Sequence, residues 1–373
     1  MNPMRILIAP DKLKGSLSAA GAAHAIRRGF GRALPGARLV EMPVADGGEG
    51  TMEVIHAARG GEWIGLAATD PLSREIAARY LWLGEETVAI IGMSEASGSR
   101  HVKPHERNPL AASTFGTGEL IRDAIDRGAA RIVAGLGGSA TNDGGIGMAA
   151  ALGYRFLTSD GEELAPIPSS LLALTSIRPG NVPPMPEIVA ACDVRNPLLG
   201  VNGATRTYGP QKGADEKAIA FLESALENLA DVAAHDLGCD FRNEPGAGAA
   251  GGLGFGLLTF CHAQIRPGFD VVAAYLNLES AIAAADLVIT AEGSLDAQTL
   301  HGKAPFGVAR LARGHGKRVV CFAGAVSAEV DWSGFFDAVH PVCDPPLPLA
   351  DSMRDAANLL EQAAHRIAQL GLL

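Results

Sequence analysis

The sequence has 373 residues, too many for one ordinary hydrophobic core, so two domains are expected. Hydrophobic residues make up 47% of the chain and charged residues 19%, which excludes an intrinsically disordered protein. The formal net charge is −10 and no run of Lys or Arg occurs, so no nucleic-acid partner is expected.

The five cysteines are scattered and none forms a CxxC pair. This pattern indicates reduced thiols and a cytoplasmic protein, and argues against a disulfide framework or a zinc site. The first residues carry charge too early for a signal peptide, and no apolar run is long enough to span a bilayer. The sequence therefore predicts no membrane partner.

Both ends of the chain predict alternating strands and helices. The N-terminal end predicts a strand over 5–9, a helix over 19–30 with Ser18 as its N-cap, and a strand over 37–44. The C-terminal end predicts strands over 285–290, 318–324 and 337–342, and helices over 305–313 and 353–370. Together the two ends are typical of one doubly wound α/β sheet.

The middle of the chain has another pattern. Strands over 77–83 and 87–91 lie close enough for a hairpin, and a helix over 119–127, a strand over 131–134 and a helix over 143–152 follow. We therefore expect a discontinuous first domain, residues 1–69 and 285–373, with a second α/β domain, residues 70–284, inserted into it.

The segment AGLGGSATNDGG, residues 134–145, combines the end of a strand, a glycine-rich turn and the start of a helix. Such a turn aims backbone amides at one point and attracts phosphate, and Ser139 and Thr141 add hydroxyl donors. Asp143 would repel phosphate unless a divalent cation lay between them, which suggests magnesium. The alternative is a tight turn in which Asn142 or Asp143 caps the helix.

Two further glycine patterns are less specific. Gly135, Gly137 and Ala140 fit the GxGxxA pattern of dinucleotide-binding folds. The cluster GAGAAGGLGFG, residues 246–256, is either a second backbone cradle or a site of close packing.

Carboxylates follow several predicted strands, at the sheet edge where open α/β folds bind ligands. They lie in three glycine-containing loops: Asp46 and Glu49, Asp193, and Glu292 and Asp296. Lysines that could hold a phosphate or carboxylate are Lys12, Lys212 and Lys303. These groups suit phosphoryl transfer, which needs positioning, a cation and a base near the acceptor hydroxyl.

The chain resembles the type-I bacterial glycerate kinases over essentially its whole length. The motifs that carry the resemblance occur in family order: DKLKGSLSA, PVADGGEGT, STFGTGEL, GLGGSATNDGGIGM, ACDVRNPLLG, YGPQKGA, GAGAAGGLG and ITAEGSLDAQTLHGKAPFGVA. The resemblance implies a flavodoxin-like discontinuous domain and an inserted restriction-endonuclease-like domain. It also implies transfer of phosphate from ATP to D-glycerate, with Mg²⁺ and 2-phosphoglycerate as product, in glyoxylate or glucarate carbon metabolism.

The resemblance suggests a role for each candidate residue. Asp193 is expected to be the base, and Lys303 to act on the transferring phosphoryl group. Asp143 and Glu292 are expected to hold magnesium. Nucleotide binding is expected from Gly137, Gly138, Ser139, Thr141, Asn142, Gly248 and Gly251. Substrate binding is expected from Lys12, Asp46, Glu49, Lys212 and Asp296.

Three alternatives remain open at this stage. The enzyme could be a 3-kinase that yields 3-phosphoglycerate. The GxGxxA pattern allows an NAD-dependent dehydrogenase, and the glycine cradles allow a non-catalytic anion-binding module. The sequence also leaves the oligomeric state open, with a homodimer as one alternative.

Overall fold

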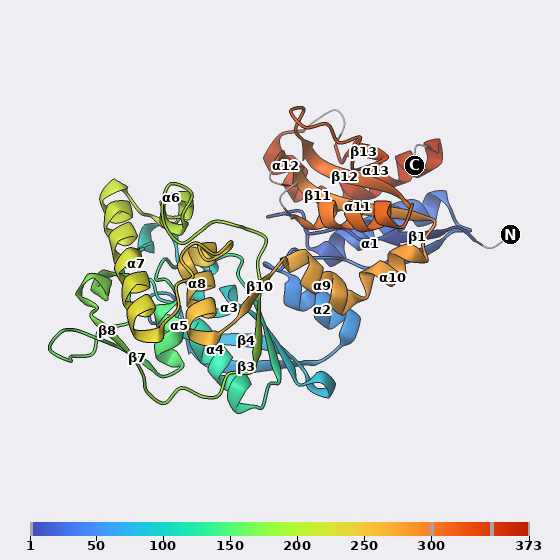
Figure 1. Ribbon diagram of the computed structural model, residues 1–373. Helices are drawn as coiled ribbons and strands as arrows, with labels where there is room; N and C mark the ends of the chain where they lie inside the picture. Colours follow the sequence, from blue (N-terminus) through green and yellow to red (C-terminus); the bar gives the residue numbers. More distant parts are fainter. Residues whose placement is uncertain (1–2, 298, 300–301, 344–346, 372–373) are drawn as a thin grey trace. The chain divides into compact units, whose positions relative to one another are not determined.

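The computed structural model describes residues 3–297, 299, 302–343 and 347–371. Positions 298, 300 and 301 of the ITAEGSLDAQTLHGKAPFGVA motif lie outside the described residues. The chain divides into two compact units, which we call unit 1 (Met1–Arg59 and Pro267–Leu373) and unit 2 (Gly60–Arg266) (Figure 1).

Within the described residues, unit 1 contains a five-stranded parallel sheet in the order β2-β1-β11-β12-β13. Its strands are β1 Arg5–Ile8, β2 Arg38–Glu41, β11 Leu287–Leu295, β12 Arg318–Val326 and β13 Ala338–Pro341. Numbered along the chain, this is the 2-1-3-4-5 order of flavodoxin-like doubly wound sheets. The order reverses between β1 and β11, and ligands bind at this switch point in such folds.

Helices cover both faces of this sheet. Successive residues of β1 point to opposite faces, so Ile6 and Ile8 pack in one core and Leu7 in another. The helices are α1 Ala19–Ala33, α2 Thr51–Arg59, α9 Gly268–Leu276, α10 Leu278–Ala283, α11 Ala304–Gly314, α12 Leu349–Arg354 and α13 Ala356–Leu370. The first core includes residues of α1 and α13, and the second includes residues of α9, α10 and α11.

Unit 2 contains a mixed six-stranded sheet in the order β10-β9-β6-β5-β4-β3 within its described residues. β3 pairs with β4 and β4 with β5 in antiparallel register, and the remaining pairs are parallel. These strands are β3 Glu62–Thr69, β4 Glu75–Leu83, β5 Val88–Gly92, β6 Arg131–Gly135, β9 Glu187–Ala191 and β10 Gln264–Arg266. A separate antiparallel pair is formed by β7 Tyr154–Leu157 and β8 Ser176–Pro179.

The helices of unit 2 share a large apolar core with this sheet. They are α3 Ser94–Ser97, α4 Phe115–Asp126, α5 Ile146–Ala151, α6 Ala204–Tyr208, α7 Glu216–Leu237 and α8 Ala249–Cys261. Short 3-10 turns complete the unit: η1 Gly84–Glu86, η2 Ser99–His101, η3 Pro104–Glu106, η4 Pro168–Ala173 and η5 Pro210–Lys212.

The α/β fold class predicted from the sequence is confirmed. Ser18 caps α1 by accepting a hydrogen bond from the backbone amide of Gly21, and β4 and β5 form the predicted hairpin across η1. The helix expected over 143–152 begins later, at Ile146, because the residues before it form a capping turn. The helix expected over 353–370 is divided into α12 and α13.

The division into units differs in position from the domain boundaries expected near residues 69 and 284. β3 belongs to unit 2 because it pairs along its length with β4. α9 and α10 belong to unit 1, where their apolar residues pack with those of α11. The hairpin of β3 and β4 moves the first boundary toward the N-terminus, and the helix packing does the same for the second.

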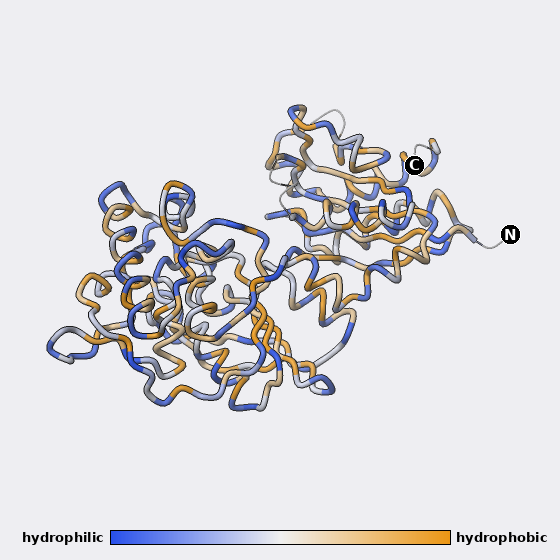
Figure 2. Tube along the Cα trace, viewed as in Figure 1, coloured by the Kyte–Doolittle hydropathy of each residue, from blue (hydrophilic) through white to orange (hydrophobic). Residues whose placement is uncertain are grey.

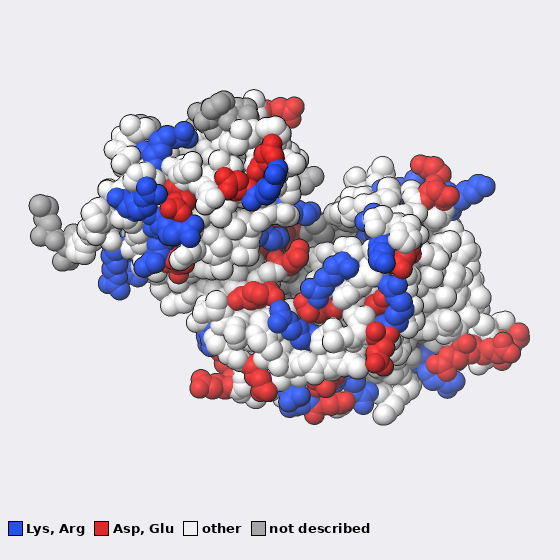
Figure 3. Space-filling model, turned by 180° about the vertical axis from the view of Figure 1, so that it is seen from behind, with Lys and Arg blue, Asp and Glu red and all other residues white. Residues whose placement is uncertain are grey.

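Hydropathy follows burial in both units. The strands of the sheets are largely hydrophobic, and the polar residues concentrate in loops and on outer helix faces (Figure 2). No helix in the described part of the chain is both long enough and apolar enough to cross a membrane. On the face shown in Figure 3, basic side chains are interspersed with acidic ones on each unit.

Candidate active site

Polar side chains gather in unit 1 where the strand order reverses. Asp11 follows β1, Asp46 follows β2, and Glu292 lies in the C-terminal half of β11. The backbone amide of Asp11 donates to Ala291 O (3.0 Å), and that of Val44 donates to Pro10 O (2.9 Å). These bonds hold the ends of the three strands together. We call Asp11, Lys12, Asp46 and Glu292 the switch-point cluster.

Burial changes the pKa values of the carboxyl groups in the switch-point cluster. Asp11 is 3% exposed and Glu292 8% exposed. Burial, followed by repulsion from Asp46, raises the pKa of Asp11 to about 7. Burial, followed by repulsion from Asp11, raises the pKa of Glu292 to about 8. Lys12 Nζ lies 3.9 Å from Asp11 Oδ1 and 3.6 Å from Asp46 Oδ1, so one ammonium group serves two carboxylates.

Three further predicted residues belong to the surroundings of this cluster. Lys303 precedes α11 and its Nζ lies 3.6 Å from Asp296 Oδ1. The Lys303 charge acts on both Asp11 and Glu292, where it partly offsets the rise in pKa. Glu49 is exposed and contributes to the negative field around Lys12.

The predicted phosphate turn of unit 2 follows β6. Gly138 is exposed, and Gly137 and Ser139 are half-buried, so these three residues are accessible to a ligand. The turn is fixed to the segment after α3, because Ser99 N donates to Gly138 O (2.9 Å) and Ala140 N to Ser97 O (3.0 Å). Gly138 has a φ of +79°, which favours glycine at this position.

Asp143 is fully buried behind this turn and holds the start of α5 in place. It accepts hydrogen bonds from Thr114 N (2.7 Å), Thr114 Oγ1 (2.8 Å), Gly145 N (3.0 Å) and Gly147 N (3.3 Å). Burial raises the pKa of Asp143, and these hydrogen bonds oppose the rise. Gly145 occupies the N-cap position of α5, and through these bonds Asp143 holds the turn in front of it. The expected role of Asp143 as a magnesium ligand stays a prediction, and the contacts weigh against it because both carboxylate oxygens are already engaged.

Thr141 and Asn142 are fully buried as well, unlike the residues before them. Lys212 Nζ donates to Thr141 O (2.7 Å), and Asn142 Nδ2 donates to Thr205 Oγ1 (2.9 Å). Burial lowers the pKa of Lys212 to about 7. Thr141 Oγ1 and Asn142 Oδ1 have no hydrogen-bond partner among the described residues. These side chains line the inner side of the turn, so a ligand on its outer side would reach Ser139 first.

Gly248 and Gly251 allow close approach between backbones. A Cβ on Gly248 would lie 2.1 Å from Pro197 O, and one on Gly251 would lie 2.0 Å from Thr141 O. Gly144 N also donates to Gly251 O (3.1 Å). These contacts favour the close-packing interpretation of the second glycine cluster. They place Gly251 of α8 directly against residues of the phosphate turn.

Asp193 lies in the loop that follows β9, the strand next to β6. It is half-buried, and Leu136 N donates to Ala191 O (3.3 Å), so the two loops leave the sheet at the same edge. The structure therefore brings Asp193 and the phosphate turn to one edge of the sheet in unit 2. Asp46, Lys12 and Glu292 come together in unit 1, as described above.

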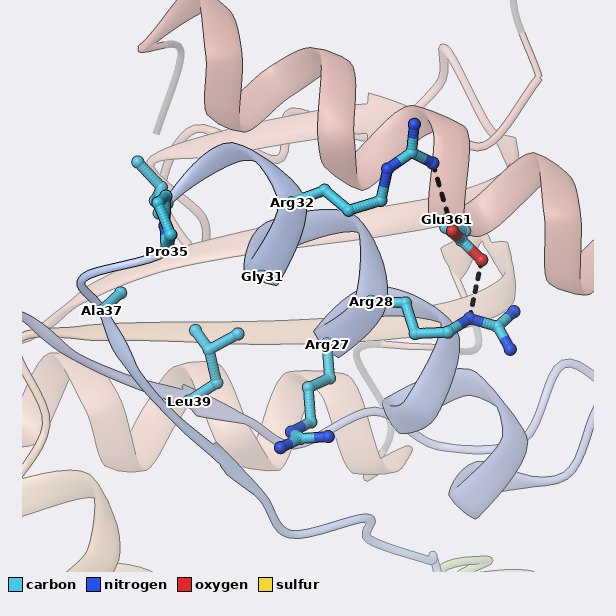
Figure 4. A pocket seen from close by; sticks show the side chains of 9 residues that line it. Arg27, Arg28, Gly31, Arg32, Pro35, Ala37, Leu39 and Glu361 are labelled. Atoms are coloured by element: carbon cyan, nitrogen blue, oxygen red, sulfur yellow. Dashed lines mark hydrogen bonds and ion pairs between the residues drawn. The ribbon is translucent and has the colours of Figure 1, made fainter.

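A hollow of about 450 Å³ in unit 1 contains none of the predicted site residues (Figure 4). It is lined by Arg27, Arg28 and Arg32 of α1, with apolar residues of the following turn and β2. Arg28 and Arg32 both pair with Glu361, and Arg27 pairs with Glu41. These arginines already have acidic partners, which is typical of a solvated surface.

Sequence reasoning missed two residues that matter here, Asp11 and Thr114. Asp11 follows a buried strand, which is the signal that pointed to Asp193, so the same rule could have found it. Thr114 could not be found, because its contact with Asp143 joins segments that are distant in the chain.

Comparisons with known proteins identify the family of this chain. A model described as the glycerate kinase family matches residues 6–372. Glycerate kinase from Bacillus subtilis is 44% identical over 374 residues, covering 98% of this chain and 97% of the relative. The chain belongs to the glycerate kinase family. Glycerate 2-kinase from Escherichia coli is 42% identical over 370 residues, with the same coverage of each chain.

Among solved structures, this glycerate kinase is similar to a crystal structure from Salmonella typhimurium LT2, described as a candidate glycerate kinase 2. The two superpose with a TM-score of 0.86 at 42% identity, covering 100% of this chain and 99% of that one. Membership of the family makes the protein a kinase, and it removes the support for a dehydrogenase or a non-catalytic module.

Proposed function

We propose that this kinase transfers the γ-phosphoryl group of ATP to D-glycerate and forms 2-phosphoglycerate. The observation that carries the proposal is the switch-point cluster, because it combines a lysine with buried carboxylates at the ligand-binding edge of a doubly wound sheet. The name of the Escherichia coli relative, a glycerate 2-kinase, favours the 2-phosphate over the 3-phosphate.

Each unit contains groups to which we assign a role in the reaction. Gly137, Gly138 and Ser139 bind nucleotide phosphates through accessible amides and a hydroxyl. Lys12 and Lys303 neutralise the glycerate carboxylate or the transferring phosphoryl group. Gly248 and Gly251 support the phosphate turn through close backbone packing. Lys212 supports it by its hydrogen bond to Thr141 O.

Asp193 is the proposed base. The glycerate hydroxyl oxygen forms a bond to the γ-phosphorus, and the bond from that phosphorus to the bridging oxygen breaks, so ADP leaves with the bond's electron pair. Asp193 accepts the proton of the hydroxyl group as the new bond forms. Asp193 is half-buried in the loop that follows β9.

A magnesium ion, which kinases use with ATP, fits the switch-point cluster better than it fits Asp143. The Oε2 atom of Glu292 is buried and has no hydrogen-bond partner within the described part of the chain. A hard cation with oxygen ligands would satisfy that atom and would neutralise charge on the phosphates.

We further propose that the reaction takes place in the cytoplasm, because all five cysteines are free thiols. The D-glycerate substrate would be formed from glyoxylate or glucarate. ATP and D-glycerate are the proposed partners.

The direct test is an assay of ADP release by the purified protein with ATP, Mg²⁺ and D-glycerate. We expect release that depends on glycerate, and an Asp193→Asn variant that is slower by about 100-fold or more. Asp160→Asn, an exposed change in the turn after β7, is the matched control and should keep the wild-type rate. Absence of glycerate-dependent ADP release would reject the proposed function. Full activity of the Asp193 variant would reject only its role as base.

A further inference from the structure

The side chains of Asp11 and Glu292 occupy fixed positions at the switch point of unit 1. Ala9 N donates to Ile289 O (2.7 Å) and Asp11 N donates to Ala291 O (3.0 Å), so the chain after β1 continues alongside β11. Thr290 Oγ1 donates to Ala9 O (2.9 Å) and closes the same contact. The backbone at Asp11 is therefore held beside the backbone of β11 next to Glu292.

Around these two carboxyl groups, negative charges outnumber positive ones. Among the described residues, Asp46, Lys12 and Lys303 act electrostatically on both Asp11 and Glu292. Glu49 acts on Lys12, and Asp296 forms an ion pair with Lys303. Lys12 is already shared between Asp11 and Asp46, and Lys303 pairs with Asp296. No lysine or arginine is recorded within ion-pair distance of Glu292 in the part of the chain that the structure describes.

One carboxylate oxygen of Glu292 is buried without a hydrogen-bond donor among the described residues. Glu292 is more than nine-tenths buried, and its Oε2 atom accepts no hydrogen bond from any described residue. A buried acceptor without a donor costs about 1 to 3 kcal/mol, and more when the group is charged. Native proteins seldom leave such an atom unsatisfied unless water, an ion or a ligand completes the site.

A divalent cation is the ligand that fits these groups. Mg²⁺ prefers oxygen ligands and is usually held by one or two carboxylates, with waters and substrate phosphates completing the octahedron. Asp11 and Glu292 supply two carboxylates at one end of the sheet, and the described residues include no group of three or more His, Cys, Asp or Glu able to hold a metal.

We propose that Asp11 is a second protein ligand, alongside Glu292, of the divalent cation used by this kinase. The purpose of the site rests on the proposed function, since a kinase uses a divalent cation with ATP. The position of Asp11 does not depend on which hydroxyl group of glycerate is phosphorylated.

The test measures Mn²⁺ binding to the full-length protein without nucleotide, by electron paramagnetic resonance of the free ion. We expect the wild-type protein to bind Mn²⁺ in competition with Mg²⁺. Asp11→Asn and Glu292→Gln should each weaken binding by at least about ten-fold, the loss already seen when groups behind a metal ligand are removed. Glu53→Gln on the exposed face of α2 makes the same charge change and should bind as the wild type does.

Thermal unfolding of the same variants provides a second readout. Mn²⁺ should raise the unfolding temperature of the wild type and of the Glu53 variant, but not that of the Asp11 variant. A melting transition for Asp11→Asn in the absence of metal shows that the variant is folded. Unchanged Mn²⁺ affinity in Asp11→Asn, or no Mn²⁺ binding by the wild type, would overturn the inference. Mn²⁺ binding without glycerate-dependent ADP release would instead reject the proposed function and keep the cation site.

Discussion

At the scale of single residues, Asp143 shows how one buried carboxylate can organise a glycine-rich turn. Its oxygens accept hydrogen bonds from Thr114 and from the amides of Gly145 and Gly147, so it joins the start of α4 to the start of α5. The amides that the sequence suggested for phosphate are thus partly used within the protein. The accessible residues Gly137, Gly138 and Ser139 are left for the ligand.

Asp143→Asn is expected to lower the free energy of unfolding by about 2 to 3 kcal/mol, because hydrogen bonds to a charged acceptor are lost and an amide group would face backbone donors. Urea denaturation followed by circular dichroism measures this change. Thr114→Ser keeps the hydroxyl donor and should cost less than Thr114→Val. A fully stable Asp143→Asn variant that fails to bind Mn²⁺ would restore the magnesium role for Asp143.

The same scale shows why one half of the site was easier to predict than the other. The sequence predicted Glu292 and Asp46 in glycine-containing loops after strands, and that local signal was sufficient to select them, although β11 continues past Glu292 to Leu295. Asp11 carries a similar signal, but its importance comes from burial beside Glu292, which depends on the order of strands in the sheet. The burial of Thr141 and Asn142 likewise depends on α6 and η5, which are distant in sequence.

At the scale of elements, α1 and α13 pack closely although they lie at opposite ends of the chain. Gly29 makes this approach possible, since a Cβ there would lie 2.4 Å from Glu361 O and 2.8 Å from His365 N. Arg28 of α1 and Glu361 of α13 form an ion pair at 2.7 Å beside it. The periodicity of each helix is readable from the sequence, whereas the pairing of these two helices is not.

Gly29→Ala should therefore destabilise unit 1 by about 1 to 3 kcal/mol, because the added methyl group meets backbone atoms that cannot move independently. Gly31→Ala in the same helix is the matched control. Its Cβ would meet nothing closer than Leu39 Cδ1 at 3.7 Å, so the gain in helix propensity should stabilise the protein by about 0.5 to 1 kcal/mol. Thermal unfolding of both variants measures these changes. Unfolding temperatures that shift in the same direction would contradict the close packing of α1 against α13 at Gly29.

At the scale of the whole molecule, the α/β class and the family follow from features that are spread over the full length of the chain. The boundary between the units was harder to place, because hairpin pairing in β3 and packing of α9 and α10 override the local composition. The motif order carries the family resemblance regardless of these boundaries. The assignment as a kinase therefore depends on motifs along the whole chain and not on any single site residue.

The central claim is that this kinase forms 2-phosphoglycerate from D-glycerate and ATP. The most direct measurement supplies the reaction with enolase but no phosphoglycerate mutase and follows phosphoenolpyruvate. We expect phosphoenolpyruvate to form in step with ADP, because enolase accepts the 2-phosphate and not the 3-phosphate. ADP release without phosphoenolpyruvate, which then appears when mutase is added, would show that the 3-phosphate is the product and would contradict the claim.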